Sequence, residues 1–130
     1  MRRRSTSFAL IAAGLIAAAG ARAAPVTQDD FLLATTANLV SLCGAASADA
    51  LYTPAQNFCQ GFVVGTFRVV SAEESASRAR HKLFCLPQNP PSRDQAVAAF
   101  VQWAAARPKT LESVPTDGLV EYFETAFPCK

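Results

Sequence analysis

The sequence predicts an all-α domain, a small antiparallel bundle of about four main helices held together by two disulfides. Three observations support this prediction. Capping signatures precede segments in which apolar residues recur every 3.6 positions. The connections between these segments are short, as in antiparallel bundles. The chain also contains four cysteines, an even number that indicates two disulfides in a small exported domain.

Residues 1–23 resemble a secretory signal peptide. Arginines at positions 2–4 form a basic start, an uncharged apolar run covers residues 8–19, and residues 21–23 have the small–x–small pattern Ala-Arg-Ala. The apolar run is about a dozen residues long, whereas a membrane-spanning helix needs roughly 20. We therefore expect cleavage after residue 23, export of residues 24–130 as a single domain, and no membrane anchor on the mature chain.

The charge of the chain changes sign with this cleavage. Four of the 12 basic residues fall within residues 1–23, so residues 24–130 keep eight basic and ten acidic side chains. A protein that binds nucleic acid needs a basic surface to neutralise phosphates. The composition therefore argues against a nucleic-acid partner.

A capping box opens the first predicted helix, with Thr27 as the cap and Asp30 three residues later. Apolar residues then recur at helical spacing as far as Cys43, and Gly44 follows as a natural terminator. We predict one continuous helix over residues 27–43.

The second predicted helix begins at Thr53-Pro54, a cap followed by proline at the first helical position, and runs to about Ala79. A strand is the alternative, because the segment contains four valines between residues 63 and 70. Gly61 and Gly65 lie four residues apart on one helical face, a spacing that permits close approach of another helix.

The third helix is predicted to open with a capping box at Ser92 and Gln95 and to end at Arg107-Pro108. Trp103 lies off its main apolar stripe, so it forms either a second edge of the core or part of a partner surface. The fourth helix is predicted from about Pro115 to Phe127.

The four cysteines allow three disulfide pairings. In an antiparallel bundle, the end of the first helix and the start of the second share one pole, which brings Cys43 near Cys59. The start of the third helix and the end of the fourth share the other pole, which brings Cys85 near Cys129. We favour this pairing because it alone joins neighbouring poles.

Candidate catalytic and metal-binding groups are few. A thiol enzyme needs a free cysteine beside a histidine, but all four cysteines have a use in disulfides and His81 is the only histidine. No HExxH or CxxC spacing supplies a zinc site. The acidic pairs at residues 29–30 and 73–74 are typical of a helix start and a solvated face. We therefore expect no enzymatic activity, no metal and no cofactor.

The polar stretch between the second and third helices is the candidate partner-binding surface. It combines a basic cluster, a cysteine anchor and a proline-stiffened turn, and a loop restrained in this way loses less entropy when it binds. The alternative is an ordinary solvated crossover. The candidate contact residues are Arg78, Arg80, His81, Gln88, Asn89 and Arg93.

Three short motifs are similar to those of the Rap/Tai proteins. Residues 57–65, NFCQGFVVG, resemble the family's aromatic-Cys-x-Gly-aromatic-x-x-Gly signature, although members usually have tyrosine where this chain has Phe58. Residues 84–87, FCLP, resemble the Cys-x-Pro element before the third helix, and residues 127–129 resemble the C-terminal Phe-Pro-Cys. The motifs occur in the same order with matching spacing and span nearly the whole predicted mature chain.

The resemblance implies a periplasmic, all-helical and often dimeric immunity protein of type VI secretion. Such proteins bind a cognate peptidoglycan amidase toxin and occlude its active site. The resemblance gives the motif residues structural roles, as cystines, close-packing glycines and a helix stop. It therefore implies a secreted amidase as the partner and a homodimer as a further possibility. Two alternatives stay open, a periplasmic acid-stress chaperone and a purely structural envelope protein.

Overall fold

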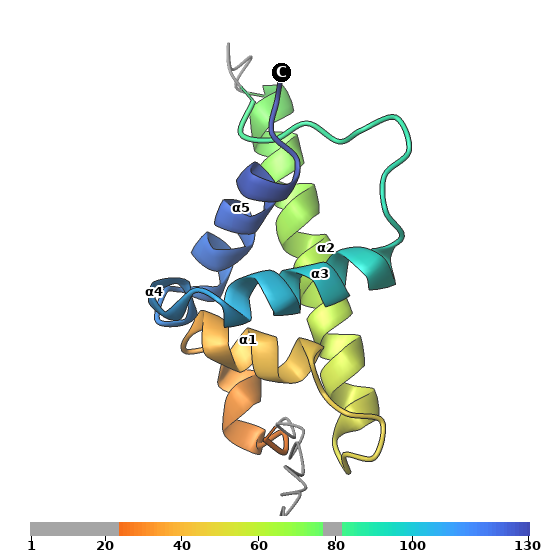
Figure 1. The fold of residues 1–130 in the computed structure, drawn as a ribbon, viewed down its shortest axis with the longest axis vertical. Helices are drawn as coiled ribbons and strands as arrows, with labels where there is room; N and C mark the ends of the chain where they lie inside the picture. Colours follow the sequence, from red (N-terminus) through yellow and green to blue (C-terminus); the bar gives the residue numbers. More distant parts are fainter. Residues whose placement is uncertain (1–23, 77–81) are drawn as a thin grey trace, which may run out of the picture.

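The computed structural model describes residues 24–76 and 82–130, and the expected signal peptide lies outside these ranges. The described residues form helices and no strands, which confirms the all-α class with four main helices. Figure 1 shows that the long helix α2 runs along the molecule. Helices α1 and α3 lie across α2, and α5 lies beside its second half. The elements are η1 (Gln28–Leu32, a 3-10 helix), α1 (Thr36–Cys43), α2 (Tyr52–Ala76), α3 (Arg93–Ala105), α4 (Pro108–Leu111) and α5 (Pro115–Ala126).

The first predicted helix is broken in two, so the prediction of one helix over residues 27–43 is wrong. The capping box at Thr27 forms, because its backbone N–H donates to Asp30 Oδ2 at 2.8 Å. It starts only the short helix η1, which ends where Leu33 adopts a left-handed conformation with φ 50°. A second capping box then starts α1, with the N–H of Thr35 donating to Asn38 Oδ1 at 3.0 Å.

Asp30 joins the two short helices. The residue is 9 % exposed, and its carboxylate accepts a hydrogen bond from the Asn38 side-chain amide at 3.0 Å, besides those from Thr27. Burial opposes the charged form, but hydrogen bonds from Thr27, Asn38 and Ser41 outweigh it and lower the pKa of Asp30 below its ordinary value. The ionised carboxylate therefore stabilises the fold.

Acid should reduce the stability that Asp30 gives to the junction between η1 and α1. Because the pKa of Asp30 is lower in the folded state, its contribution is present above the unfolded pKa of about 3.9 and is lost as the pH falls through the folded value. We expect the Asp30→Asn variant to be less stable than the wild type by about 2 kcal/mol at pH 7. Urea unfolding at pH 7, 5, 4 and 3 should show that difference shrink, and a difference independent of pH would contradict this account.

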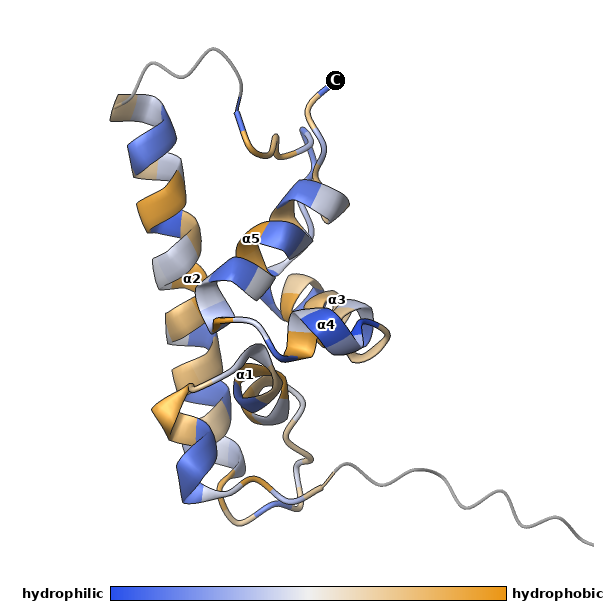
Figure 2. Ribbon diagram, turned by 90° about the vertical axis from the view of Figure 1, so that its left-hand side faces the viewer, coloured by the Kyte–Doolittle hydropathy of each residue, from blue (hydrophilic) through white to orange (hydrophobic). Residues whose placement is uncertain are grey.

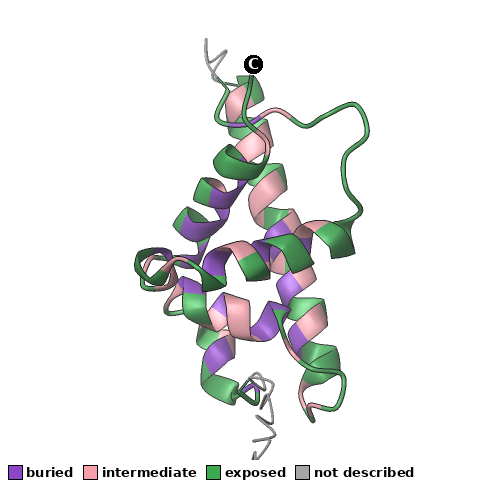
Figure 3. Cartoon of the chain, in the orientation of Figure 1, coloured by how far each residue is buried: buried purple, intermediate pink, exposed green. Residues whose placement is uncertain are grey.

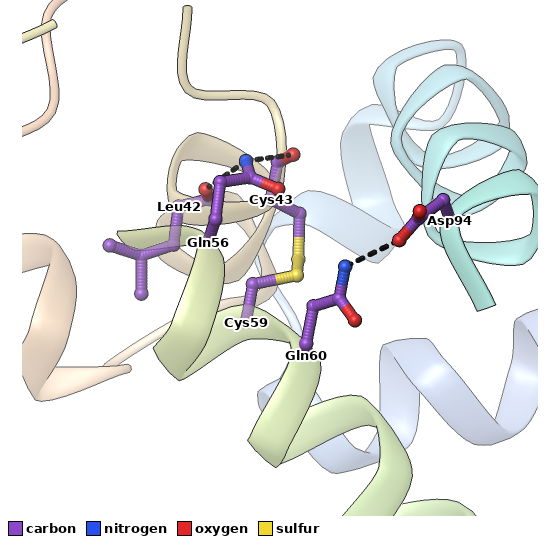
Figure 4. The surroundings of a disulfide bond; sticks show 6 residues. All are labelled: Leu42, Cys43, Gln56, Cys59, Gln60 and Asp94. Atoms are coloured by element: carbon purple, nitrogen blue, oxygen red, sulfur yellow. Dashed lines mark hydrogen bonds between the residues drawn. A yellow bond between two sulfur atoms is a disulfide. The ribbon is translucent and has the colours of Figure 1, made fainter. Parts of the chain in front are cut away.

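Helix α2 is continuous from Tyr52 to Ala76, so the strand alternative for its valine-rich centre is wrong. The expected extension toward residue 79 lies outside the described residues. Near its start, the side-chain amide of Gln56 donates to the backbone carbonyls of Leu42 and Cys43, at 3.3 and 3.0 Å (Figure 4). Gln56 thereby satisfies two of the carbonyls that the end of α1 leaves without helical partners.

The later helices follow the sequence prediction closely. The capping box of α3 forms, with the N–H of Ser92 donating to Gln95 Oε1 at 2.8 Å. Helix α3 ends at Ala105, shortly before the predicted end at Arg107-Pro108, and Pro108 begins the short helix α4, which was not predicted. Pro115 begins α5 as predicted.

The core lies where α1, α3 and α5 meet the inner face of α2. Figure 3 shows the buried residues on facing sides of these helices, and Figure 2 shows hydrophobic residues recurring along α2 and α5. The largest fully buried side chains come from α1, α2, α3 and α5, and they are Phe100, Leu39, Leu42, Leu119, Thr36 and Cys59.

Both disulfides form as predicted, Cys43–Cys59 and Cys85–Cys129. The first joins the end of α1 to the first half of α2 (Figure 4). The second joins the loop before α3 to the segment after α5. Each disulfide therefore fixes a junction between elements that are separate in the sequence.

The predicted close packing at Gly61 and Gly65 does not occur within the chain. Both glycines are exposed, and among the described residues a Cβ built at either would meet no atom of another segment within 4 Å. The two glycines do share a face, but that face of α2 is open to solvent, beside Thr116 and Val120 of α5. The glycine at a close approach is Gly118 in α5, which lies against Thr36 of α1.

Candidate partner-binding surface

Residues 84–92, called the proline loop below, connect α2 to α3 and are fixed at their start. The ring of Phe84 is buried between Phe67 of α2 and Phe123 of α5, with centroid distances of 5.6 and 5.2 Å. Cys85 is bonded to Cys129, and its N–H donates to the carbonyl of Phe127 at 2.7 Å. The loop therefore leaves the body of the protein from a rigid point.

The far end of the proline loop is also held. The side-chain amide of Gln60 in α2 donates to Asp94 Oδ1 at 2.6 Å, and this hydrogen bond joins the first turn of α3 to α2 (Figure 4). The guanidinium of Arg93 donates to Gln60 Oε1 at 3.4 Å. Figure 1 shows the loop arching outward from the end of the molecule near the C-terminus and returning to the start of α3.

Between these two ends the loop is open to solvent. All residues from 86 to 91 are exposed, and neither Gln88 nor Asn89 makes a hydrogen bond to another described residue. Arg93 is exposed at the junction with α3. The structure thus presents three of the six candidate residues on or beside one anchored loop. Arg78, Arg80 and His81 lie outside the described residues.

An aromatic cluster supports the loop and the start of α3 from below. Tyr122 of α5 contacts the rings of Phe100, Trp103, Phe123 and Phe127, and its hydroxyl donates to the carbonyl of Ala96 at 3.2 Å. Burial raises the pKa of Tyr122, so the hydroxyl stays a donor at neutral pH. The cluster gives α3 and α5 a rigid shared face.

Trp103 belongs to the edge of this core. Its ring lies 5.5 Å from that of Tyr122, and the guanidinium of Arg107 lies over it at 4.4 Å. The side chain is partly buried, and Arg107 is held in place by donating to the Trp103 carbonyl at 2.9 Å. These contacts favour the core interpretation of Trp103 over the partner-surface one.

The described residues offer few groups for catalysis or metal binding. All four cysteines are in disulfides, so no thiol is free to act as a nucleophile. Residues 24–76 and 82–130 contain no group of three or more His, Cys, Asp or Glu side chains placed to hold a metal ion. In the same ranges no helix is both long and apolar enough to cross a membrane.

A cavity of about 290 Å³ lies beneath the proline loop, and the sequence did not predict it. Its walls come from α2, from the loop together with the start of α3, and from α5 with Phe127, so it depends on three stretches that are distant in the sequence. The only local signal is Arg68, a charge within the otherwise uncharged run of residues 61–70. The lining residues are Val63, Val64, Phe67, Arg68, Leu86, Pro90, Pro91, Arg93, Ala96, Phe123 and Phe127.

Comparison with known proteins identifies the family. A family model described as Rap1a immunity proteins matches residues 35–129. The chain belongs to the Rap1a immunity protein family. The match contains both disulfides, the proline loop and every residue that lines the cavity, whereas η1 lies before it. No curated protein and no solved structure matches the chain.

Membership of this family suggests what kind of partner the exposed loop binds. An immunity protein acts by binding a toxin protein, so the family implies a protein partner and a role as a non-enzymatic inhibitor. The two disulfides fit a secreted or periplasmic member of the family.

Proposed function

We propose that residues 24–130 act in the periplasm as an immunity protein that binds a type VI secretion peptidoglycan amidase and occludes its active site. The family match carries this proposal. The anchored, solvent-exposed proline loop supports it, because a loop fixed at both ends by Cys85 and Asp94 loses little entropy when it enters a cleft. Export through a cleaved signal peptide supplies the location.

The test is inhibition of the amidase encoded beside this gene. The full precursor with a C-terminal tag is expressed and purified from the periplasm, and its mass reports whether cleavage follows residue 23. The purified protein should inhibit release of peptidoglycan fragments at a one-to-one ratio. Full hydrolysis at a tenfold excess of this protein would exclude the proposed inhibition.

The loop residues should contribute to binding. We expect the double variant Gln88→Ala/Asn89→Ala, and separately Arg93→Ala, to bind the amidase roughly tenfold or more weakly, as alanine substitution at an interface centre does. Gln102→Ala and Lys109→Ala, at exposed positions elsewhere, are matched controls that should leave affinity unchanged. Calorimetry measures all four, and equal affinities would place the contact outside the proline loop.

We further propose that a second copy covers the exposed stripe of α2. The stripe contains Gly61, Phe62, Gly65 and Val69 of α2, with Val120 of α5 beside it, and Val69 is 63 % exposed. Because a Cβ built at either glycine has no described atom of another segment within 4 Å, the helix of a second copy has room to pack there. Patches of this kind mark protein contacts.

Gly65→Arg should convert this homodimer to a monomer without unfolding it, since Gly65 is exposed and a Cβ there meets no described atom within 4 Å. Light scattering after size-exclusion chromatography measures the mass over a range of concentrations. Ala98→Arg, an exposed position on α3, is the control that should keep the wild-type mass. A monomeric wild type at 100-fold different concentrations would contradict the dimer.

A further inference from the structure

The cavity beneath the proline loop is lined by apolar side chains and two arginines. Apart from two arginines, its walls are apolar, and no carboxylate lines it. Its volume of about 290 Å³ lies just below the roughly 300–1,000 Å³ that is usual for small-molecule sites. It therefore has room for one or two large side chains rather than for a whole lipid.

The two arginines at the cavity are available to a ligand. Arg68 is exposed and makes no hydrogen bond or ion pair with another described residue. Arg93 makes one hydrogen bond at 3.4 Å, to the neutral amide of Gln60. Neither charge is balanced within the described part of the chain. An occupant without an anionic group would bury these cations uncompensated, which is unfavourable.

The cavity and the proline loop form one continuous surface. Leu86, Pro90 and Pro91 line the cavity from the loop, and the candidate contacts Gln88 and Asn89 lie between them in the sequence. A partner that contacts the outside of the loop is thus next to the cavity opening. Typical protein interfaces, at roughly 800 Å² a side, are large enough to include both.

We propose that the cavity receives a protruding segment of the toxin in which a large apolar side chain lies next to a carboxylate. The apolar side chain fills the space between Phe67 and Phe127, and the carboxylate pairs with Arg68 and Arg93. This inference rests on the proposed immunity function and deepens it. In that complex, the proline loop enters the toxin while the toxin enters the cavity behind the loop.

The first test uses two short probes and the isotope-labelled protein. The acidic peptide acetyl-Glu-Phe-Leu-Glu-amide should shift the NMR methyl signals of Val63, Val64 and Leu86, because these residues line the cavity. The basic peptide acetyl-Lys-Phe-Leu-Lys-amide should bind roughly tenfold more weakly or not at all. Arg68→Glu should abolish this preference, because it leaves Arg93 opposed by a carboxylate, and the matched charge change Lys109→Glu, outside the cavity, should not.

The second test fills the cavity. Ala96→Phe places a ring in the space from α3, and Ala99→Phe adds the same ring at an exposed position of the same helix. Circular dichroism checks that both fold. The first variant should lose the acidic peptide and bind the amidase roughly tenfold more weakly, whereas the second should bind both as the wild type does. If Ala96→Phe does not fold, the Arg68→Glu result decides.

Several outcomes would overturn the inference. Equal binding of the two peptides would show that the arginines do not select a carboxylate. NMR shifts confined to residues outside the cavity would show that the peptide binds elsewhere. Tighter binding of sodium octanoate than of the acidic peptide would make the cavity a site for fatty acids. Retained amidase binding by Ala96→Phe, together with loss in the Gln88→Ala/Asn89→Ala variant, would reject the cavity and keep the immunity function. Failure of the wild type to bind any amidase would instead reject the function.

Discussion

Replacing Cys43 and Cys59 together by alanine should lower the free energy of unfolding by about 3 kcal/mol, or slightly more. The disulfide joins residues separated by 16 positions in the sequence. Cross-linking a loop of that length stabilises a protein by about 3 kcal/mol, mainly by restricting the unfolded chain. Cys43 and Cys59 are both buried, so removing their sulfurs also leaves a small void in the core. Urea unfolding under oxidising conditions measures the loss.

The other disulfide provides the comparison. Cys85 and Cys129 are separated by 44 positions, so loop length alone predicts a larger loss, about 4 kcal/mol, for their double alanine variant. Cys129 is exposed, however, and its removal leaves no void. A loss below about 1 kcal/mol at Cys43–Cys59 would contradict the prediction and show that Gln56 and the core hold the α1–α2 junction alone.

The parts of this fold that the sequence predicted are those with local chemical signals. The boxes at Thr27 and Ser92 and the proline at residue 115 act within one helical turn, so their effect can be read without the rest of the structure. The disulfide pairing followed from the order and polarity of four helices. Local signals and simple topology were sufficient here.

The features that were missed depend on contacts between distant residues. The break at Leu33 reflects a second capping box at Thr35, and Asn38 bridges back to Asp30 across the break. The spacing of apolar residues did not show this interruption, and Leu32, inside the predicted helix, is 76 % exposed. The cavity beneath the proline loop requires three separate stretches of the chain to meet, and Arg68 is its only local signal in the sequence.

The glycines show the same limit most clearly. Gly61 and Gly65 have the spacing of a close helix contact, yet the chain leaves both open. Gly118 stands alone, without a spacing motif, and is buried where α5 crosses α1. Which glycine is required depends on which helix faces another, and that is a property of the tertiary structure.

Gly118→Ala should therefore destabilise the protein by about 2–3 kcal/mol, although alanine is normally the better helix former by about 1 kcal/mol. A Cβ at this position would overlap Thr36 Oγ1 and lie 2.7 Å from Thr36 Cγ2. Thr36 is fully buried, and its hydroxyl is 3.1 Å from the carbonyls of both Ser113 and Val114. The side chain cannot turn away without losing these hydrogen bonds. Gly61→Ala, in open space, should instead stabilise α2 by about 0.5–1 kcal/mol.

A double-mutant cycle identifies the cause. Thr36→Ala removes Oγ1 and Cγ2, the two atoms nearest to the new Cβ, and leaves only Thr36 Cβ at 3.1 Å. Adding Gly118→Ala to this background should then cost roughly 2 kcal/mol less than in the wild type, a coupling within the range measured for residues in contact. Additive effects would mean that the loss arises elsewhere in α5. The sign of a glycine substitution in a helix is set here by one threonine on a neighbouring helix.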